Sequence, residues 1–352
     1  PYNRRVLETH IKQLTAAQPM NAAQVHAAVE LLADGKIAAS LKAEFLIALA
    51  QKGETPEEIA AFARALRQKS VPLPLPEPWR ESHEILDIVG TGGDRLGTFN
   101  ISTTSAILCA AAGVVVAKHG NRAVTSQAGS ADVLEALGVR IDLTPTEAAR
   151  SLQEKNFAFF FAPNFHPAFQ HIASARKLCA ERGRRTIFNF LGPLLNPARP
   201  SAMLVGVPRA ELCEPLAKVL QSLGVRRGLV ASGTVDGAAR IDELSTLGDN
   251  FVAEFYHARG FTSSTLALEN FPLQPAKLAD LLGGDKFQNA EITRKILRGQ
   301  DRGPKRDAVL LNAGAALFVA GKARSLAEGW ELAEKTIDSG AADAKLAELV
   351  GG

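Results

Sequence analysis

A glycine-rich loop after the first predicted strand is the part of this sequence best suited to chemistry. An apolar run at 84–89 predicts a buried strand, and it stops at Gly90, Gly92 and Gly93. Glycine has no Cβ, so the backbone there can turn tightly and approach a ligand closely. The alanine-rich segment 102–112 predicts a helix whose free N–H groups would face the loop and favour an anion. We therefore predict that the loop binds a phosphate-bearing ligand, with help from the polar residues Asp94, Asn100, Ser102, Thr103 and Thr104.

The spacing of these glycines excludes two common phosphate-binding motifs. No Lys-Ser or Lys-Thr pair follows them, as the P-loop of nucleoside triphosphatases requires. The dinucleotide fingerprint needs a third glycine at position 95, which is Arg95. The glycines could form only a tight turn, but the polar side chains between Asp94 and Thr104 favour a binding loop.

A second polar group follows the next predicted strand. Residues 118–122 read Lys-His-Gly-Asn-Arg, and ligands in open α/β sheets lie beyond the carboxyl ends of the strands. Lys118 could neutralise a phosphate, while His119 and Asn121 could orient a second substrate. A solvated basic loop is the alternative, but Gly-Ser-Ala-Asp at 129–132 predicts another helix start and a further anion cradle nearby.

An adjacent pair of carboxylates, Asp242 and Glu243, follows the predicted strand 227–231 and a glycine-rich loop. Such a pair suits Mg²⁺, a hard ion that keeps several waters and bridges carboxylates to substrate phosphates. An Asp-Glu pair alone is usually a surface feature, so the interpretation depends on the neighbouring loops. Arg176 likewise allows two interpretations. It could be a charge exposed to solvent, or its planar guanidinium group could bind a carboxylate.

Composition restricts the class of protein. The chain has 352 residues, 46% of them hydrophobic and 22% charged, which predicts a globular fold of one large domain or two. A net charge of +3 does not indicate nucleic-acid binding. The three cysteines lie apart in apolar or helical contexts, as expected of core residues in a reducing compartment. No segment resembles a signal peptide or a membrane span, so we expect a soluble, cytoplasmic protein.

The first seventy residues predict helices with clear start signals. Asn21 with Gln24 predicts a capping box, Ser40 precedes a second apolar stripe, and Thr55 opens a third helix. Prolines then alternate at 71–78, cannot continue a helix, and predict an extended linker at a domain boundary.

Beyond the linker, predicted strands and helices alternate, which is typical of an α/β layer. The predicted strands are 84–89, 114–117, 157–161, 202–207, 227–231 and 251–256. The predicted helices are 102–112, 130–137, 145–155 and 209–223, with amphipathic helices again from Asn289 onward.

Taken together, these motifs resemble the anthranilate phosphoribosyltransferase family, which is related to nucleoside phosphorylases. The matching segments are Gly90–Asp94, Thr98–Thr103, Lys118–Arg122, Gly129–Asp132, Arg185–Asn189, Asp242-Glu243, Gly283–Asp285 and Asp307–Asn312. The resemblance implies a large α/β domain with a central, mostly parallel sheet flanked by helices, plus a small all-α domain. It assigns 1–76 to the small domain, with 167–196 returning to it, and 77–166 and 197–352 to the large one. It also implies a homodimer through the helical domain.

The resemblance implies a reaction of tryptophan biosynthesis: the amine of anthranilate attacks C1 of phosphoribosyl pyrophosphate, and pyrophosphate leaves. It implies Mg²⁺ as cofactor, held by Ser102, Asp242 and Glu243. The residues implied for phosphoribosyl pyrophosphate are Gly90, Gly92, Gly93, Asp94, Thr98, Asn100, Ser102, Thr103, Lys118 and Ser130. Those implied for anthranilate are Gly90, His119, Asn121, Pro163, His166 and Arg176. An aromatic amine is neutral at pH 7, so no acid, base or covalent nucleophile is expected, only charge stabilisation and alignment.

The chain departs from the family pattern in two places. About three extra residues, roughly one helical turn, lie between Arg176 and Thr186. Counting forward from His166 assigns the carboxylate of anthranilate to Arg176, whereas counting back from Thr186 points to Arg182. We favour Arg176, because an insertion after it does not change the direction in which the preceding helical residues face. The family's His-Gly before the acidic pair is replaced by Ala-Ser-Gly at 231–233.

Two other functions are weighed against this reading. A pyrimidine nucleoside phosphorylase would share the fold but lack the acidic pair that Asp242 and Glu243 form. A non-catalytic, nucleic-acid-binding paralogue would also lose that pair and would gain a basic surface. The sequence favours neither.

Overall fold

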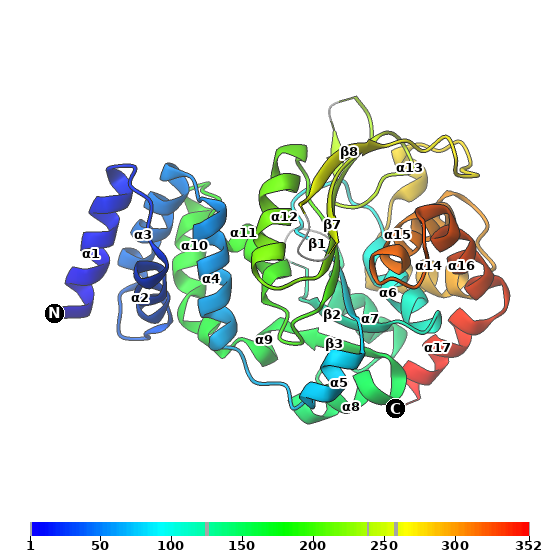
Figure 1. Cartoon of the computed structure of the whole chain (residues 1–352), viewed down its shortest axis with the longest axis horizontal. Helices are drawn as coiled ribbons and strands as arrows, with labels where there is room; N and C mark the ends of the chain where they lie inside the picture. The colour runs from blue at the N-terminus through cyan, green and yellow to red at the C-terminus, as the bar shows by residue number, and fades with distance from the viewer. Residues whose placement is uncertain (1, 124–126, 238, 257–259, 352) are drawn as a thin grey trace.

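The computed structural model describes residues 2–123, 127–237, 239–256 and 260–351, and it consists of two parts that lie side by side (Figure 1). The smaller part is formed by helices from the N-terminal end of the chain, and the larger part surrounds a twisted sheet. The first four helices are α1 (Tyr2–Thr15), α2 (Ala22–Ala33), α3 (Ala39–Lys52) and α4 (Pro56–Gln68).

The start signals of these helices are largely as predicted. Asn21 and Thr55 form capping boxes, with Gln24 and Glu58 as their respective partners. α3 begins at Ala39 without a side-chain cap, so Ser40 lies inside the helix rather than before it.

The proline-rich linker is shorter than predicted. Residues 71–76 form neither helix nor strand, but α5 (Glu77–Ser82) begins inside the segment expected to stay extended to 78. Pro78 lies in the first turn of α5, where a missing N–H costs no helical hydrogen bond.

Eight strands form one sheet in the described residues, with the order β3-β2-β1-β4-β5-β7-β8 and with β6 paired to β5. Their bounds are β1 (Ile85–Gly90), β2 (Val115–Gly120), β3 (Phe157–Phe161), β4 (Ala202–Gly206), β5 (Arg227–Thr234), β6 (Arg240–Ile241), β7 (Asn250–Tyr256) and β8 (Thr262–Leu266). β3, β2, β1, β4 and β5 are parallel, whereas β6, β7 and β8 are antiparallel to their neighbours. The predicted mostly parallel sheet is confirmed, and its strand order reverses between β1 and β4.

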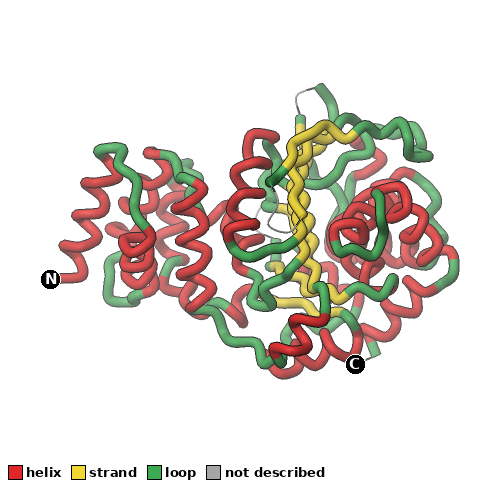
Figure 2. The backbone as a smooth tube through the Cα atoms, viewed as in Figure 1, coloured by secondary structure: helices red, strands yellow, loops and turns green. Residues whose placement is uncertain are grey.

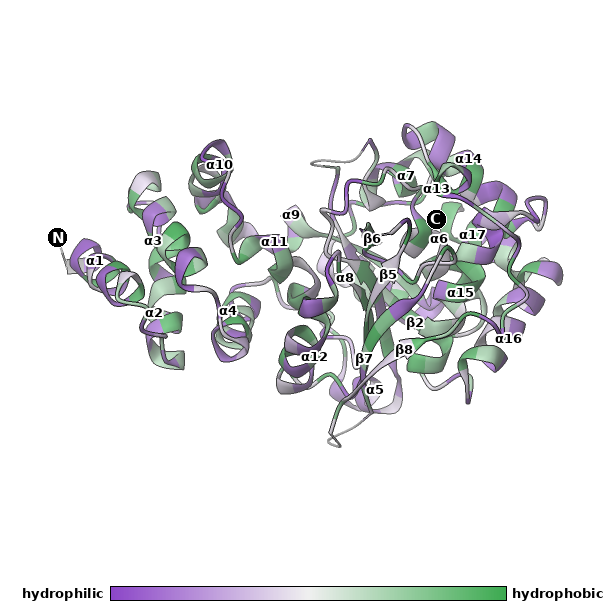
Figure 3. Ribbon diagram, turned by 90° about the horizontal axis from the view of Figure 1, so that it is seen from above, coloured by the Kyte–Doolittle hydropathy of each residue, from purple (hydrophilic) through white to green (hydrophobic). Residues whose placement is uncertain are grey.

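Two strands were not predicted, and each lacks the signal on which such a prediction depends. β6 has only two residues, and β8 is a polar edge strand with the sequence Thr-Ser-Ser-Thr-Leu. In Figure 3, β8 is accordingly pale beside the apolar β7. Hydrogen bonds to β7, not apolar burial, hold β8 in the sheet.

Helices cover both faces of the sheet (Figure 2). The bounds are α6 (Ile101–Ala111), α7 (Ser130–Leu137), α8 (Pro145–Lys155), α12 (Cys213–Ser222), α13 (Leu278–Leu281), α14 (Lys286–Leu297), α15 (Pro304–Val319), α16 (Leu326–Asp338) and α17 (Ala341–Val350). The predicted helix 209–223 is split, since a 3₁₀ turn, η3 (Ala210–Leu212), precedes α12. None of the helices in the described ranges has the length and apolar character needed to cross a membrane.

The chain returns to the helical part after β3. The returning elements are α9 (Ala162–Phe165), η1 (Pro167–His171), α10 (Ala173–Glu181), α11 (Phe188–Leu191) and η2 (Gly192–Leu195). α10 packs against α3, and η2 packs against α4. One apolar core runs from these helices to the face of the sheet that carries Met203 and Val205, while another fills the opposite face under α6 and α15. The exact domain boundaries stay a prediction.

Candidate functional site

The site is built around two glycines at the point where the strand order reverses. Gly90 ends β1, Gly206 ends β4, and the two are paired across the strands. The N–H of Thr91 donates to the carbonyl of Gly206 over 2.9 Å. A Cβ on either glycine would overlap Asp242, so both positions must lack a side chain for Asp242 to sit at this edge. Sequence reasoning missed Gly206, although a glycine closing an apolar strand is a usable signal.

The acidic pair and the glycine-rich loop are in direct contact. The carboxylate of Asp242 accepts a hydrogen bond from the N–H of Gly92 over 2.6 Å. Gly92 and Gly93 have φ values of +77° and +93°, a backbone conformation that glycine adopts without strain. The guanidinium of Arg185 lies close by, with Nη2 3.6 Å from where a Cβ on Gly93 would be.

The carboxylates at this edge carry an unbalanced negative charge. Burial raises the pKa of Asp242 well above its usual value, and the neighbouring carboxylates of Asp94 and Glu243 raise it further. Burial also raises the pKa of Glu243 to about 7, although the ammonium of Lys118 opposes that shift. Glu243 accepts a hydrogen bond from the N–H of Ser102, at the start of α6, over 3.3 Å. A bound cation would relieve this repulsion.

Lys118 lies under the loop rather than in an open loop of its own. Its side chain is 2% exposed, and its Nζ donates to the carbonyl of Ile88 over 2.8 Å and lies 3.5 Å from the hydroxyl of Ser102. Asp87 is a buried counter-charge, and its carboxylate accepts a hydrogen bond from the amide of Asn196 over 2.9 Å. Burial raises the pKa of Asp87 to about 6, against the effect of Lys118. The lysine therefore places its amino group beneath the phosphate loop, where burial lowers its pKa and the carboxylates of Asp87 and Glu243 oppose that shift.

Residues from the C-terminal third hold the loop in place. Thr98 pairs with Leu282 in an isolated bridge, and the N–H of Gly283 donates to Gly97. The amide of Asn289 donates to the side chain of Asn100 over 3.0 Å. These contacts give a physical reason for the segment Gly283–Asp285 that the family resemblance had singled out. Sequence reasoning did not identify Asn289, whose signal is an amide in the buried stripe of α14.

The backbone that follows the acidic pair is held by a second buried amide. The side chain of Asn312, in α15, accepts from the N–H of Leu244 over 3.0 Å and donates to the carbonyl of Leu244 over 2.9 Å. Asn312 is fully buried. The segment Asp307–Asn312 thereby contacts the site from the far side of the core.

The hydroxyls of Thr91 and Thr103 have no hydrogen-bond partner within the described ranges, although both oxygen atoms are buried. Both residues border the phosphate loop, and a buried polar group without a partner is uncommon in folded proteins.

The second predicted anion cradle is partly filled by the chain itself. The N–H groups of Ala123 and Gly129 both donate to the carboxylate of Asp132 over 2.9 Å. The hydroxyl of Ser130 donates to the carbonyl of Asn121 over 3.4 Å. Asp132 thus already supplies the negative charge at the start of α7, a contact that the glycine-led motif does not predict.

A continuous line of ring contacts joins the predicted anthranilate residues. His119 and His166 meet edge-on with ring centres 5.2 Å apart, and His166 stacks on Phe169 at 5.3 Å. Phe169 contacts Phe188 at 5.7 Å, and the guanidinium of Arg176 lies over Phe188 at 5.4 Å. Arg176 and His166 are therefore members of one aromatic cluster between the two parts of the chain.

The other predicted anthranilate residues border this cluster along the chain. Pro163 is exposed in α9, just before His166, and Asn121 is exposed directly after β2. Arg182 is exposed at the end of α10, and in the described residues it shows only backbone hydrogen bonds.

The two histidines are neutral and lie within hydrogen-bond distance of each other. Burial lowers the pKa of His119 to about 3 and that of His166 to about 4. Nδ1 of His119 lies 3.2 Å from the carbonyl of Gly192, so a neutral ring must carry its proton there. Nε2 of His119 and Nε2 of His166 lie 3.2 Å apart, and a hydrogen bond to the backbone of Leu195 opposes the lowering of the pKa of His166. Neither ring is arranged as a general base.

The donor set favours a hard cation held only in part by the protein. Carboxylate and hydroxyl oxygens gather at the loop, and the described ranges contain no group of three or more His, Cys, Asp or Glu side chains arranged to hold a metal. Mg²⁺ is commonly bound through one or two carboxylates together with substrate phosphates. The three cysteines are buried and unpaired, as predicted for core residues.

Comparisons with known proteins agree with this architecture. A family model described as "Glycosyl transferase family, a/b domain" matches residues 82–343, and one described as "Glycosyl transferase family, helical bundle domain" matches 8–70. The anthranilate phosphoribosyltransferase of Petrotoga mobilis is 44% identical, with 97% of this chain and 95% of that protein covered. That of Rubrobacter xylanophilus is 43% identical, covering 98% and 97%.

Solved structures give the same result. The crystal structure of the Thermus thermophilus enzyme has a TM-score of 0.87 and 42% identity, covering 97% of this chain and 98% of that one. The Saccharomyces cerevisiae enzyme in complex with PRPP and Mg has a TM-score of 0.86 and 27% identity, covering 98% and 97%.

Proposed function

This chain belongs to the anthranilate phosphoribosyltransferase family and transfers the phosphoribosyl group of 5-phosphoribosyl 1-pyrophosphate to the amine of anthranilate, and we propose that the edge between β1 and β4 is where it does so. The products are N-(5-phosphoribosyl)anthranilate and pyrophosphate, in tryptophan biosynthesis. The observation that carries the assignment of the site is the hydrogen bond from Gly92 to Asp242. It joins the phosphate-binding loop to the acidic pair at the switch point of the sheet, where ligands of open α/β folds bind.

We assign the phosphoribosyl pyrophosphate site to the glycine loop, the start of α6 and the lysine beneath them. Backbone N–H groups of the loop and the positive end of α6 favour phosphate oxygens there, and Lys118 lies beneath them. Two observations support this assignment. The hydroxyl of Thr103 has no hydrogen-bond partner among the described residues, and the guanidinium of Arg185 lies close to Gly93. The proposed residues are Gly90, Gly92, Gly93, Asp94, Thr98, Asn100, Ser102, Thr103, Lys118 and Ser130.

The reaction uses Mg²⁺, and Asp242, Glu243 and Ser102 fit as its ligands. When bound with the substrate, the ion supplies positive charge beside the pyrophosphate. Asp242 and Glu243 provide hard oxygen donors whose mutual repulsion favours a cation. The hydroxyl of Ser102 lies beside Lys118 and completes the donor set.

Anthranilate is proposed to bind against the aromatic cluster between the two parts of the chain. Arg176 offers a planar guanidinium for its carboxylate, and the neutral rings of His119 and His166 form an apolar wall. The residues proposed for this substrate are Gly90, His119, Asn121, Pro163, His166 and Arg176. The amine of anthranilate is nucleophilic without deprotonation, so alignment and charge stabilisation at C1 are sufficient.

The wider assignments rest on the family resemblance. We propose a homodimer through the helical domain, a cytoplasmic location, and the domain division 1–76 with 167–196, and 77–166 with 197–352. Light scattering coupled to size-exclusion chromatography at micromolar concentration tests the dimer. A mass equal to one chain at all concentrations would contradict it.

Release of pyrophosphate, measured with and without anthranilate, tests the function. We expect release that requires anthranilate, phosphoribosyl pyrophosphate and Mg²⁺ together, and an equal rate of loss of free anthranilate. Phosphate-dependent cleavage of a pyrimidine nucleoside, with no anthranilate-dependent release, would instead assign the nucleoside phosphorylase reaction.

A further inference from the structure

A separate hollow lies where the linker joins the helical part to the sheet. It has a volume of about 460 Å³ and is lined by the linker, by Ile85 and by the residues before β4. Ile85 is the first residue of β1 and Gly90 is its last, so about 17 Å of extended strand separates this hollow from the glycine loop. We call it the linker pocket. Its polar lining includes Arg67, Ser70, Glu77, Arg80 and Arg199.

Three arginines line the linker pocket, and none of them forms an ion pair with a carboxylate of the described residues. Arg67 is 9% exposed, its Nε donates to the carbonyl of Leu194 over 2.6 Å, and its buried Nη2 has no partner among the described residues. Nη1 of Arg80 donates to the carbonyl of Ala198 over 2.7 Å. Arg199 is exposed, and none of the three forms an ion pair within the described ranges. Because Nη2 of Arg67 is buried, the charge of this side chain is poorly solvated, and an anion in the pocket would stabilise that charge.

Arg67 and Arg80 of the linker pocket have lowered pKa values, because they are buried and are repelled by the charge of Arg199. Burial, together with the positive charges of Arg199 and Arg64, lowers the pKa of Arg67 to about 10. Burial also lowers the pKa of Arg80, where the carboxylate of Glu77 opposes the shift and the charge of Arg199 adds to it. Three guanidinium groups and one carboxylate leave an excess of two positive charges.

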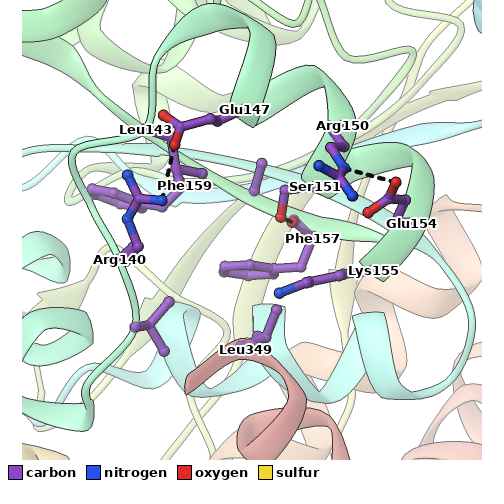
Figure 4. Close-up of a pocket in the computed structure, with 12 residues that line it drawn as sticks. Arg140, Leu143, Glu147, Arg150, Ser151, Glu154, Lys155, Phe157, Phe159 and Leu349 are labelled. Carbon is purple, nitrogen blue, oxygen red and sulfur yellow. Dashed lines mark hydrogen bonds and ion pairs between the residues drawn. The ribbon is translucent and has the colours of Figure 1, made fainter. Parts of the chain in front are cut away.

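A second hollow in the same molecule provides a contrast. It lies between α8, β3 and α17 and has a volume of about 210 Å³ (Figure 4). Arg140 points to Glu147 there, with a separation of 2.9 Å, and Arg150 pairs with Glu154 over 2.8 Å. Both arginines of that hollow are therefore paired with carboxylates, which leaves Lys155 as its one cation without an ion pair among the described residues. The three arginines of the linker pocket have no such partner in the part of the chain that is described.

We propose that the linker pocket binds a phosphate dianion, either free or as a monoester of a small compound. Guanidinium groups match phosphate oxygens in bidentate geometry, and a phosphate group at pH 7 carries nearly the two negative charges that the pocket lacks. Val71, Leu73 and Pro197 form an apolar wall that leaves room for the organic part of a monoester.

The position of the pocket gives the bound anion a mechanical role. Arg67 belongs to α4, Arg80 to α5, and Arg199 to the segment that leads into β4. These segments form the connections between the helical part and the sheet, so an anion held by all three arginines ties the connections together. Bound phosphate therefore restrains the linker and the return segment at the same time.

Hydrogen–deuterium exchange of the full chain tests the proposal directly. Inorganic phosphate is titrated at constant ionic strength, with sodium chloride as the balancing salt, and glycerol phosphate is titrated in a second arm. We expect saturable protection of amides in 68–76 and 197–201, separable from any protection in the glycine loop. Tighter binding of phosphate assigns the free ion, and tighter binding of glycerol phosphate assigns a monoester.

Variants of Arg199 identify the pocket as the source of the protection. Arg199→Ala should weaken the phosphate affinity measured at 68–76 about tenfold, the loss expected for one charge-assisted contact. Because Arg199 has a φ of +49°, Arg199→Gly removes the same guanidinium at lower backbone cost and provides a second, fold-safe variant. Arg324→Ala, which removes an exposed arginine before α16, is the matched control and should change nothing. Absence of saturable protection, or protection that persists in both Arg199 variants, would overturn the proposal.

Discussion

The side-chain amide of Asn312 makes two hydrogen bonds to the backbone of Leu244, one as donor and one as acceptor, directly after the acidic pair. Asn312 belongs to α15 and is separated from Leu244 by 68 residues of sequence. The amide therefore fixes the path of the backbone that presents Asp242 and Glu243. It acts as a positioning residue, because it touches neither the loop nor the proposed ligands.

Asn312→Ala should reduce kcat and raise the Mg²⁺ concentration needed for half-maximal activity. Two buried backbone groups lose their partner, which costs about 1–3 kcal/mol of stability, and the acidic pair becomes less well ordered. Thermal unfolding and Mg²⁺-dependent pyrophosphate release measure the two effects. Asn270→Ala, an exposed amide, is the control. An unchanged Mg²⁺ requirement with lowered stability would assign Asn312 a merely structural role.

Replacing Asp242 and Glu243 by Asn and Gln should abolish turnover and leave the fold intact. Their raised pKa values mean that the charged forms are disfavoured by burial, so neutral isosteres do not lower stability. In the unaltered chain, calorimetry should detect Mg²⁺ binding only with phosphoribosyl pyrophosphate present, because the protein supplies part of the ligand set. Full activity of the double variant with Mg²⁺ would refute the metal assignment.

Gly92→Ala should weaken binding of phosphoribosyl pyrophosphate and leave the KM for anthranilate nearly unchanged. A Cβ at Gly92 meets nothing within 4 Å, so the cost comes from the φ of +77° and from the lost approach to phosphate. The backbone cost is about 1–2 kcal/mol. Gly224→Ala is a matched control, with a φ of +87° and open space around it. Equal substrate affinity in the two variants would show that the loop is only a turn.

Arg176→Ala should raise the KM for anthranilate by about tenfold or more, with little effect on the KM for phosphoribosyl pyrophosphate. Arg176→Lys should recover only part of the loss, since an ammonium lacks the planar fork. Arg182→Ala serves as the comparison, because Arg182 is the alternative from counting back along the sequence. If Arg182→Ala alone shows the anthranilate effect, the insertion lies before that residue and the assignment is wrong.

His166→Gln should make stability less sensitive to acid. His166 has a folded pKa of about 4 against about 6.5 in the unfolded chain, so the unfolded chain binds more protons between these values. Stability therefore falls as pH decreases through this window, by about 2 kcal/mol at pH 5 relative to a chain without the group. Urea unfolding at pH 7.5 and pH 5 measures the difference, and Gln retains a donor for His119. The exposed His26→Gln variant is the control, and identical pH profiles for His166→Gln and the unaltered chain would contradict the prediction.

The sequence by itself determined the elements and the chemistry that depend on neighbouring residues. The capping boxes at Asn21 and Thr55, the extended linker, and the strand-loop-helix unit around Gly92 are local patterns, set by backbone conformation and side-chain hydrogen bonds over a few residues. The family resemblance extended these patterns to a reaction and to a set of residues. That set includes Asp242 and Glu243, an adjacent pair that without the resemblance would not have indicated a metal site.

The tertiary structure alone decided which distant groups meet. The paired glycines Gly90 and Gly206 leave room for Asp242, and the buried amide of Asn312 holds the chain after it. The polar edge strand β8 and the three arginines of the linker pocket likewise depend on partners far away in sequence. Contacts of this kind follow from strand order and from how helices pack on the sheet, neither of which is written in local composition or periodicity.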